Sequence, residues 1–241
     1  TLQYTFFCFE YKNIIAIYVK DVNSFYYQAL KIFYPFHNAY IIGVTGTCGK
    51  TTTVSLLYES LKYSNNNVLL LCSNGNFSYY NNKEVYYETF NTTPNIETVY
   101  KKNKKKEYDF VIIDTPPNLG TQTLNALMAS DHVVVMFETA KYAYNAIDRF
   151  LETINSVRKY GNEELNILGI LATLSDARRS DNKELLELVQ EEYGDLIFNT
   201  VIPRRAAIGR IPVYGLYDNP ELKAATEHHA KFIEEVLTRV N

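Results

Sequence analysis

Residues 43 to 52 read Gly43-Val44-Thr45-Gly46-Thr47-Cys48-Gly49-Lys50-Thr51-Thr52 and follow the apolar run 40–42. Apolar residues at helical spacing come next, at Val54, Leu56, Leu57 and Leu61. A strand, a glycine-rich turn and a helix in this order are typical of a P-loop, in which backbone N–H groups and the positive end of the helix face a phosphate. The segment therefore predicts a site for ATP or GTP.

The P-loop pattern predicts a role for each residue of the segment. Lys50 is expected to reach the β- and γ-phosphates, and the Thr51 hydroxyl group to hold Mg²⁺. Backbone N–H groups of residues 46–50 are expected to surround the β-phosphate. The residues predicted to contact the nucleotide are Gly46, Thr47, Cys48, Gly49, Lys50, Thr51 and Thr52. Because Val44 replaces the usual glycine six positions before Lys50, a tight turn without ligand is the alternative.

A second motif lies at residues 110–114, where an apolar strand (FVIID) ends in Asp114. This is the Walker B arrangement, in which the aspartate holds Mg²⁺, here through a water molecule. Ligands of open α/β sheets bind at the carboxyl ends of the strands, so Lys50, Thr51 and Asp114 are expected to converge. Lys50 and Asp114 are the predicted catalytic residues, and Thr51 and Asp114 the predicted metal ligands. An aspartate that merely ends a strand is the alternative.

The rest of the chain alternates between strand and helix patterns. Strands are expected at 2–19 (one or two), 41–45, 68–71, 110–114, 132–137, 167–174 and 196–202, with a hairpin over 77–90 that turns at Asn81-Asn82. Helices are expected at 22–33, 50–63, 95–107, 121–129, 144–158, 182–193 and 221–240. This alternation predicts an α/β fold of P-loop NTPase type, a mostly parallel sheet with helices on both faces in three layers. Residues 1–39 are predicted to form an extension, and residues 40–241 the nucleotide-binding domain.

The composition and charge of the chain bear on its location in the cell and on its binding partners. The 241 residues carry a net charge of −3 and include no apolar run of ~18 residues, so no membrane span is expected. Three cysteines (Cys8, Cys48 and Cys72) form neither a disulfide framework nor a zinc pattern, which fits a cytoplasmic protein. Residues 1–107 carry a charge of +4 and residues 108–241 a charge of −7. This break indicates two segments of different origin, or else chance clustering in a lysine-rich sequence.

Five motifs follow one another from residue 108 onward: 108–120 (YDFVIIDTPPNLG), 124–127 (LNAL), 174–178 (LSDAR), 198–204 (FNTVIPR) and 212–215 (PVYG). In this order they resemble the ParA/MinD family of partitioning ATPases over nearly all of residues 108–241. The resemblance implies an ATP-dependent dimer that binds DNA nonspecifically in plasmid or chromosome partitioning, and a centromere-binding partner protein that triggers hydrolysis.

The same resemblance implies positions for further residues. Pro203 and Arg204 would lie near the adenine. The candidates for contacts with the DNA backbone are Arg178, Arg179, Arg204, Arg205 and Arg210. Such contacts are independent of base sequence and weaken with salt. Surface salt bridges are the alternative role for these arginines.

The chain departs from this family at two positions. Thr45 replaces the signature lysine that reaches the partner's nucleotide, and residues 72–76 (CSNGN) replace an acidic motif that positions the attacking water. The expected activity is therefore slow ATP hydrolysis with weakened dimerisation.

The front of the chain shows other motifs, at 19–22 (VKDV), 43–53 (GVTGTCGKTTT), 82–85 (NKEV) and 91–94 (NTTP). These resemble the Mur ligase family, in particular its tripeptide-synthesising branch, over about residues 12–107. The resemblance implies that Thr92, Thr93 and Pro94 help to hold a UDP-sugar substrate. It predicts a chimera joined near residue 107, and an alternative function as a fragment of an ATP-dependent ligase that adds an amino acid to a UDP-muramyl peptide.

Overall fold

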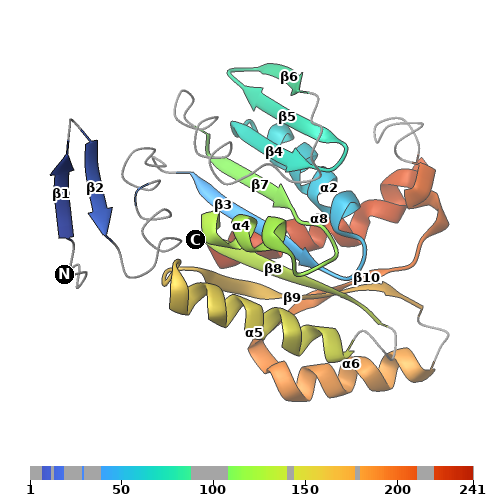
Figure 1. Cartoon of the computed structure of the whole chain (residues 1–241). Helices are drawn as coiled ribbons and strands as arrows, with labels where there is room; N and C mark the ends of the chain where they lie inside the picture. The colour runs from blue at the N-terminus through green and yellow to red at the C-terminus, as the bar shows by residue number, and fades with distance from the viewer. Residues whose placement is uncertain are drawn as a thin grey trace.

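The computed structural model describes residues 7–11, 14–18, 29, 39–87, 108–139, 144–176, 180–210 and 220–240. Its centre is an eight-stranded sheet with the order β10-β9-β8-β3-β7-β4-β5-β6 (Figure 1). Six of these strands run parallel to their neighbours, from β10 to β4. The mostly parallel sheet that the sequence predicts is therefore confirmed.

The parallel strands are the apolar runs of the sequence. Their bounds are β3 (Tyr40–Gly46), β4 (Val68–Cys72), β7 (Phe110–Asp114), β8 (His132–Glu138), β9 (Asn166–Ser175) and β10 (Ile197–Pro203). Every residue of β4 and β7 is buried. Strands buried on both faces need continuous apolar sequence rather than alternation, which explains why these runs were recognisable.

The predicted hairpin forms the antiparallel edge of the sheet. It consists of β5 (Gly75–Tyr80) and β6 (Lys83–Tyr87), and it turns at Asn81 and Asn82, whose φ angles are 50° and 59°. Asparagine tolerates this left-handed conformation better than most residues. The hairpin starts at Gly75 rather than residue 77, because a tight turn at residues 73–74 lets Gly75 pair with Cys72.

Helices cover both faces of the sheet (Figure 1). One apolar cluster joins the sheet to α4 (Thr121–Ala129), α5 (Tyr144–Tyr160) and α6 (Ser180–Tyr193). The opposite cluster joins it to α2 (Lys50–Tyr63) and α8 (Pro220–Val240). Two short 3-10 helices, η1 (Gly194–Leu196) and η2 (Ala206–Arg210), flank β10. The three-layer architecture is thus confirmed, and none of the helices in the described segments is long and apolar enough to cross a membrane.

The N-terminal strands form a separate two-stranded antiparallel sheet, β1 (Phe7–Tyr11) and β2 (Ile14–Tyr18). Several predictions lie outside the described residues. They are most of the helix at 22–33, the helix at 95–107, the segment Thr92-Thr93-Pro94, the junction near residue 107, and Arg178 and Arg179.

Candidate functional site

The loop between β3 and α2 has the backbone shape that its glycines permit. Gly46 has a φ angle of 129° and Gly49 one of 81°, in the region that residues with a side chain rarely adopt. A Cβ atom on Gly46 would overlap the backbone of Met136 in β8. The close approach of the loop to β8 therefore requires glycine at position 46.

Strand β8 holds the first part of this loop. The Thr47 N–H group donates to the carbonyl oxygen of Met136 (2.9 Å), and the Thr47 hydroxyl oxygen accepts from the backbone N–H of Glu138 (3.0 Å). The Thr173 hydroxyl oxygen in β9 lies 3.4 Å from the carbonyl oxygen of Cys48. The Thr47 N–H group is thus engaged with the sheet, whereas the sequence predicts it among the phosphate-facing groups.

The second part of the loop runs into the first turn of α2. The first helical hydrogen bond joins the Thr53 N–H group to the carbonyl oxygen of Gly49 (3.0 Å). The N–H groups of Lys50, Thr51 and Thr52 come before this bond, so the helix itself offers them no acceptor. The positive end of the helix dipole lies at the same place. This end of α2 has the chemistry of an anion site.

Lys50 is folded back over the loop. Its ammonium group donates to the carbonyl oxygen of Gly46 (2.7 Å), and its side chain is buried. Burial lowers the pKa of Lys50, and the nearby Asp114 carboxylate opposes this effect. The cation is therefore already next to the loop, held by one backbone hydrogen bond.

Thr51 and Asp114 meet at the carboxyl edge of the sheet. The register of β3 and β7 aligns Val44 with Asp114, and the Thr51 hydroxyl group donates to the Asp114 carboxylate (2.7 Å). Asp114 is only 3% exposed, and burial raises its pKa, while the Thr51 hydrogen bond and the Lys50 charge lower it. A hydroxyl and a carboxylate oxygen are the hard ligands that Mg²⁺ prefers, so this pair fits the predicted metal.

The structure describes both parts of the chain that depart from the ParA/MinD pattern, Thr45 and the segment 72–76. Thr45 is completely buried in β3, and its hydroxyl oxygen has no hydrogen-bond partner among the described residues. The segment 72–76 is the tight connection from β4 to β5, with Asn76 buried in β5. Position 45 is thus occupied by a small side chain enclosed within the sheet.

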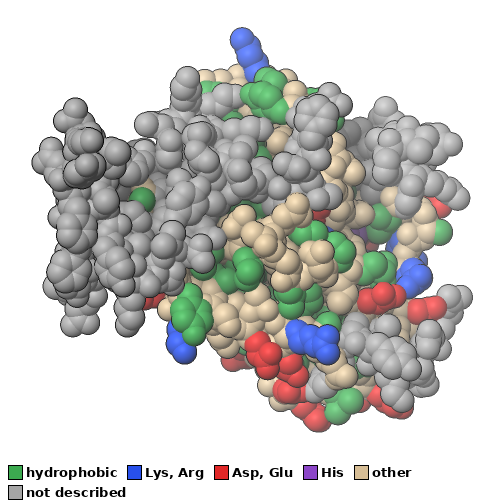
Figure 2. Space-filling model, viewed as in Figure 1, with side chains coloured by type: hydrophobic (Ala, Val, Ile, Leu, Met, Phe, Trp, Pro, Cys, Tyr) green, Lys and Arg blue, Asp and Glu red, His purple; other side chains and the backbone are tan. Residues whose placement is uncertain are grey.

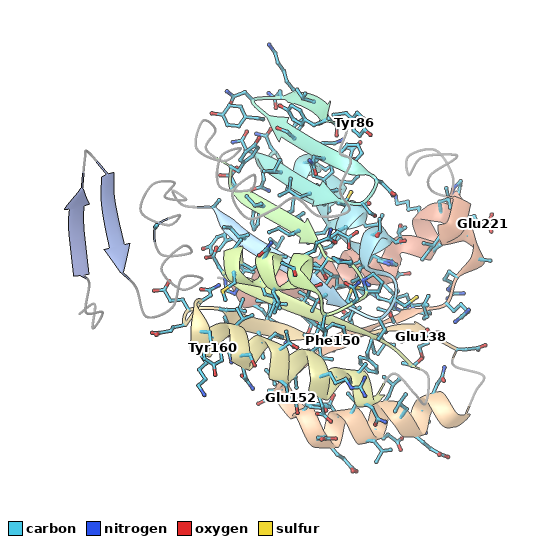
Figure 3. All side chains as sticks on the ribbon, in the orientation of Figure 1. Tyr86, Glu138, Phe150, Glu152, Tyr160 and Glu221 are labelled. Carbon is cyan, nitrogen blue, oxygen red and sulfur yellow. The ribbon has the colours of Figure 1, made fainter. Side chains whose placement is uncertain are left out.

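The predicted adenine loop lies at the end of β10. Pro203 is paired with Ser175 of β9, and the Arg204 N–H group donates to the Ser175 carbonyl oxygen (2.9 Å). The Arg204 guanidinium group forms an ion pair with the Glu138 carboxylate (2.8 Å). Figure 3 places Glu138 at the end of β8. The salt-bridge alternative for Arg204 is thus observed.

The other arginines give less information. Arg205 is exposed and makes no ion pair within the described part of the chain. The side chain of Arg210, like Arg178 and Arg179, lies outside what the structure describes. Glu138 was not predicted from the sequence, and the only signal it carries is its place after the apolar run 133–137.

Acidic side chains gather on the face formed by α5 and α6. Figure 2 shows them over the lower part of the molecule, where these helices lie in Figure 1. Exposed members are Asp148, Glu152, Glu184, Glu187, Glu191 and Glu192. A face with this charge repels polyanions.

Comparison with known proteins finds sequence similarity over part of the chain. A family model described as an AAA domain matches residues 80–167, which begin before residue 107. The sporulation initiation inhibitor protein Soj of Bacillus subtilis is 40% identical over 118 residues, which are 47% of this chain and 47% of that protein. The chromosome-partitioning ATPase Soj of Treponema pallidum is 34% identical over 139 residues, which are 56% of this chain and 54% of that protein. The chain thus spans about half the length of these curated relatives.

Solved structures show the same fold. An ATP complex of a McdA variant from Cyanothece has a TM-score of 0.66 at 16% identity, covering 83% of this chain and 97% of that one. Cobyrinic acid a,c-diamide synthase of Mycobacterium smegmatis with bound ADP and magnesium has a TM-score of 0.62 at 22% identity, covering 84% and 95%. None of these four proteins is a Mur ligase by name, so that resemblance gains no support from them. The described part of the chain has the P-loop NTPase fold, and about half of the chain is similar in sequence to Soj-type partitioning proteins.

Proposed function

We propose that this chain binds ATP with Mg²⁺ and hydrolyses it slowly, as a ParA/MinD-type ATPase in plasmid or chromosome partitioning. The observation that carries the proposal is the 2.7 Å hydrogen bond between Thr51 and Asp114 beside the buried Lys50. It brings one residue from each of two separate motifs to one edge of the sheet. The bound ADP and magnesium of the cobyrinic acid a,c-diamide synthase and the bound ATP of the McdA variant support the choice of ligands.

Each residue of the site has a role in this proposal. The N–H groups at the start of α2 bind the phosphates together with residues 46–49, and Lys50 exchanges its bond to Gly46 for one to the β- and γ-phosphates. Thr51 and Asp114 hold Mg²⁺, which when bound neutralises charge on the phosphates. Pro203 and Arg204 lie on the adenine side. The γ-phosphoryl group passes to water, and ADP and inorganic phosphate are the products.

The interaction partners belong to the proposal as well. DNA binds nonspecifically through Arg205 with Arg178, Arg179 and Arg210. A centromere-binding protein is the expected activator. The partitioning function of the Treponema pallidum relative supports both partners, and a cytoplasmic location fits this work.

Self-association is expected to be weak. The small buried Thr45 leaves the chain without the lysine that would reach a partner's nucleotide, so ATP should not drive tight dimerisation. Sedimentation of the protein with ATP and Mg²⁺ measures this directly. A tight nucleotide-dependent dimer would contradict it.

The proposed organisation has an extension at residues 1–39 and a nucleotide-binding domain at residues 40–241. The separate sheet of β1 and β2 and the start of the large sheet at Tyr40 support this division. We place a junction between the two sequence types near residue 107, where the motifs change and the charge break falls.

An ATPase assay with and without DNA tests the proposal. Lys50→Ala should remove phosphate release, and Lys223→Ala, on the exposed side of α8, is the control. The unmodified protein should release phosphate slowly and faster with DNA and a centromere-binding partner. A rate that is the same in Lys50→Ala would exclude the P-loop from the reaction.

A further inference from the structure

The end of β8 connects the P-loop with the loop after β10. The backbone N–H of Glu138 donates to the Thr47 hydroxyl oxygen (3.0 Å), and its carboxylate pairs with the Arg204 guanidinium group (2.8 Å). The Arg204 backbone is fixed in turn by its hydrogen bond to Ser175 (2.9 Å). One residue therefore contacts both sides of the proposed nucleotide site, one with its backbone and the other with its side chain.

The pair between Glu138 and Arg204 is accessible and exchangeable. The Arg204 side chain is 60% exposed and that of Glu138 is 31% exposed. Ion pairs in such contact with water contribute little to stability, because solvent screens them and both side chains lose freedom. The guanidinium group can therefore leave Glu138 when a stronger anion arrives.

A nucleoside triphosphate is such an anion. It carries several negative charges, and guanidinium groups bind phosphate oxygens with two parallel hydrogen bonds. The backbone of Glu138 is held to Thr47, so its side chain starts beside the P-loop. Its carboxylate therefore competes with the phosphates for the same cation.

We propose that Glu138 is a positioning residue that holds Arg204 before nucleotide binds and limits the affinity for nucleotide phosphates. This inference rests on the proposed function. The Arg204 backbone stays on the adenine side, and its guanidinium group, which reaches Glu138 at the end of β8, is then a second cation for the phosphates beside Lys50. Glu138 is its counter-ion when no nucleotide is bound. Removing the carboxylate should strengthen ATP binding, which is the opposite of what a merely structural residue would do.

The experiment measures the dissociation constants of ATP, ADP and AMP with Mg²⁺ by isothermal titration calorimetry. Glu138→Gln keeps the backbone bond to Thr47, and it should bind ATP about 3- to 10-fold more tightly than the unmodified protein. The gain should decrease from ATP to ADP to AMP, because fewer phosphates remain for Arg204. Arg204→Ala should bind ATP about 3- to 10-fold more weakly.

The double variant decides whether Glu138 acts through Arg204. In the Arg204→Ala background, Glu138→Gln should bring no gain in ATP affinity. The matched control is Glu227→Gln, which changes the exposed 2.8 Å pair of Glu227 and Lys231 on α8 and should leave the affinity unchanged. Thermal unfolding of each variant shows that the fold is retained.

The outcomes separate this inference from the proposed function. No binding of ATP by the unmodified protein would overturn the proposed function. Normal ATP binding with equal or weaker affinity in Glu138→Gln would overturn the inference alone. A gain that persists without Arg204, or that is equal for ATP and AMP, would also overturn it.

Discussion

The Thr51 hydroxyl group donates a 2.7 Å hydrogen bond to the Asp114 carboxylate and so joins the first turn of α2 to the end of β7. These two residues are 63 positions apart in the chain, and the hydrogen bond joins them at the edge of the sheet. The carboxylate is almost fully buried, and its burial raises its pKa. The site thus holds a charge that the folded protein alone solvates poorly.

The first prediction concerns this buried charge. Asp114→Asn should raise the free energy of unfolding of the metal-free protein by about 1 kcal/mol, because a neutral amide is less costly to bury than a carboxylate. The same variant should lose Mg²⁺-dependent ATP binding. Urea unfolding and calorimetry with ATP and Mg²⁺ measure the two effects. Lower stability together with normal binding would be the contrary result.

The second prediction compares two glycines. Gly46→Ala should lower the free energy of unfolding by about 3 kcal/mol or more, because its Cβ atom meets the Met136 backbone and its φ angle is 129°. Gly194→Ala is the control, since Gly194 also has a positive φ angle (50°) but no atom within 4 Å of the added Cβ. It should lose about 1 kcal/mol. Equal losses in urea unfolding would show that the contact with β8 is unimportant.

The third prediction concerns Arg239 near the end of α8. Its guanidinium group donates to the carbonyl oxygens of Leu168 (3.0 Å) and Ile197 (2.7 Å) and lies 4.2 Å from the centre of the Phe198 ring. Arg239→Ala should lower the free energy of unfolding by about 2 kcal/mol, since two partly buried carbonyl groups lose their donors. Arg239→Lys should recover only part of this loss, because an ammonium group cannot span both strands.

Denaturant unfolding measures the effect, and Arg205→Ala serves as the surface control. That variant should stay within about 0.5 kcal/mol of the unmodified protein. If Arg239→Lys were as stable as the unmodified protein, the positive charge alone would account for the stabilisation, rather than the two guanidinium donors.

The fourth prediction concerns the hydroxyl group of Thr45. It is fully buried and lacks a partner among the described residues, so Thr45→Val should raise the free energy of unfolding by about 1 kcal/mol. Thr173→Val is the matched comparison, because the Thr173 hydroxyl group donates to the Phe137 carbonyl oxygen (3.0 Å). It should lose about 1 kcal/mol. Thermal unfolding that shows a loss in Thr45→Val would point to a polar contact that the hydroxyl makes.

The fifth prediction concerns pH. His229 in α8 is buried, and burial lowers its pKa to about 4, with a smaller contribution from His228. The native protein then binds fewer protons than the unfolded chain between about pH 4 and the usual histidine value near 6.5. The free energy of unfolding should therefore fall as the pH drops through this window, by up to about 3 kcal/mol.

Urea unfolding at a series of pH values between 4 and 7 measures this dependence. His229→Gln should flatten the curve, and His228→Gln, at a partly exposed position, should not. An unchanged slope in His229→Gln would assign the acid sensitivity to other groups.

The sequence was sufficient for most of the sheet, since apolar runs such as residues 110–114 end where the buried strand ends. The sequence also predicted that Lys50, Thr51 and Asp114 lie close together, because strand order and the P-loop pattern fix their positions, and the structure has them so. The start of β5 was wrong, because Gly75 and Asn76 have no apolar alternation and become a strand only by pairing with β4. Contacts between distant segments decide such cases.

In the candidate site, Glu138 is a residue that the sequence could not identify, for the same reason. A glutamate after an apolar strand matches no motif, and its contacts with Thr47 and Arg204 arise only when β8 lies beside β3 and β10 ends nearby. Likewise, the sequence identifies the missing lysine at Thr45 but cannot show that the hydroxyl is enclosed. The similarity of the front segment to Mur ligases rests on short loops and stays a prediction.

The central place of β3, between β7 and β8, has a consequence for protein synthesis. The ribosome synthesises the whole glycine-rich loop long before it adds Met136. The backbone of Met136 is the part of β8 that holds Thr47. Nascent chains that end before β8 therefore lack a formed pocket, and ATP cannot protect them from proteases. Ligand-dependent protection should appear abruptly with nascent length, once the segment up to Glu138 has left the exit tunnel.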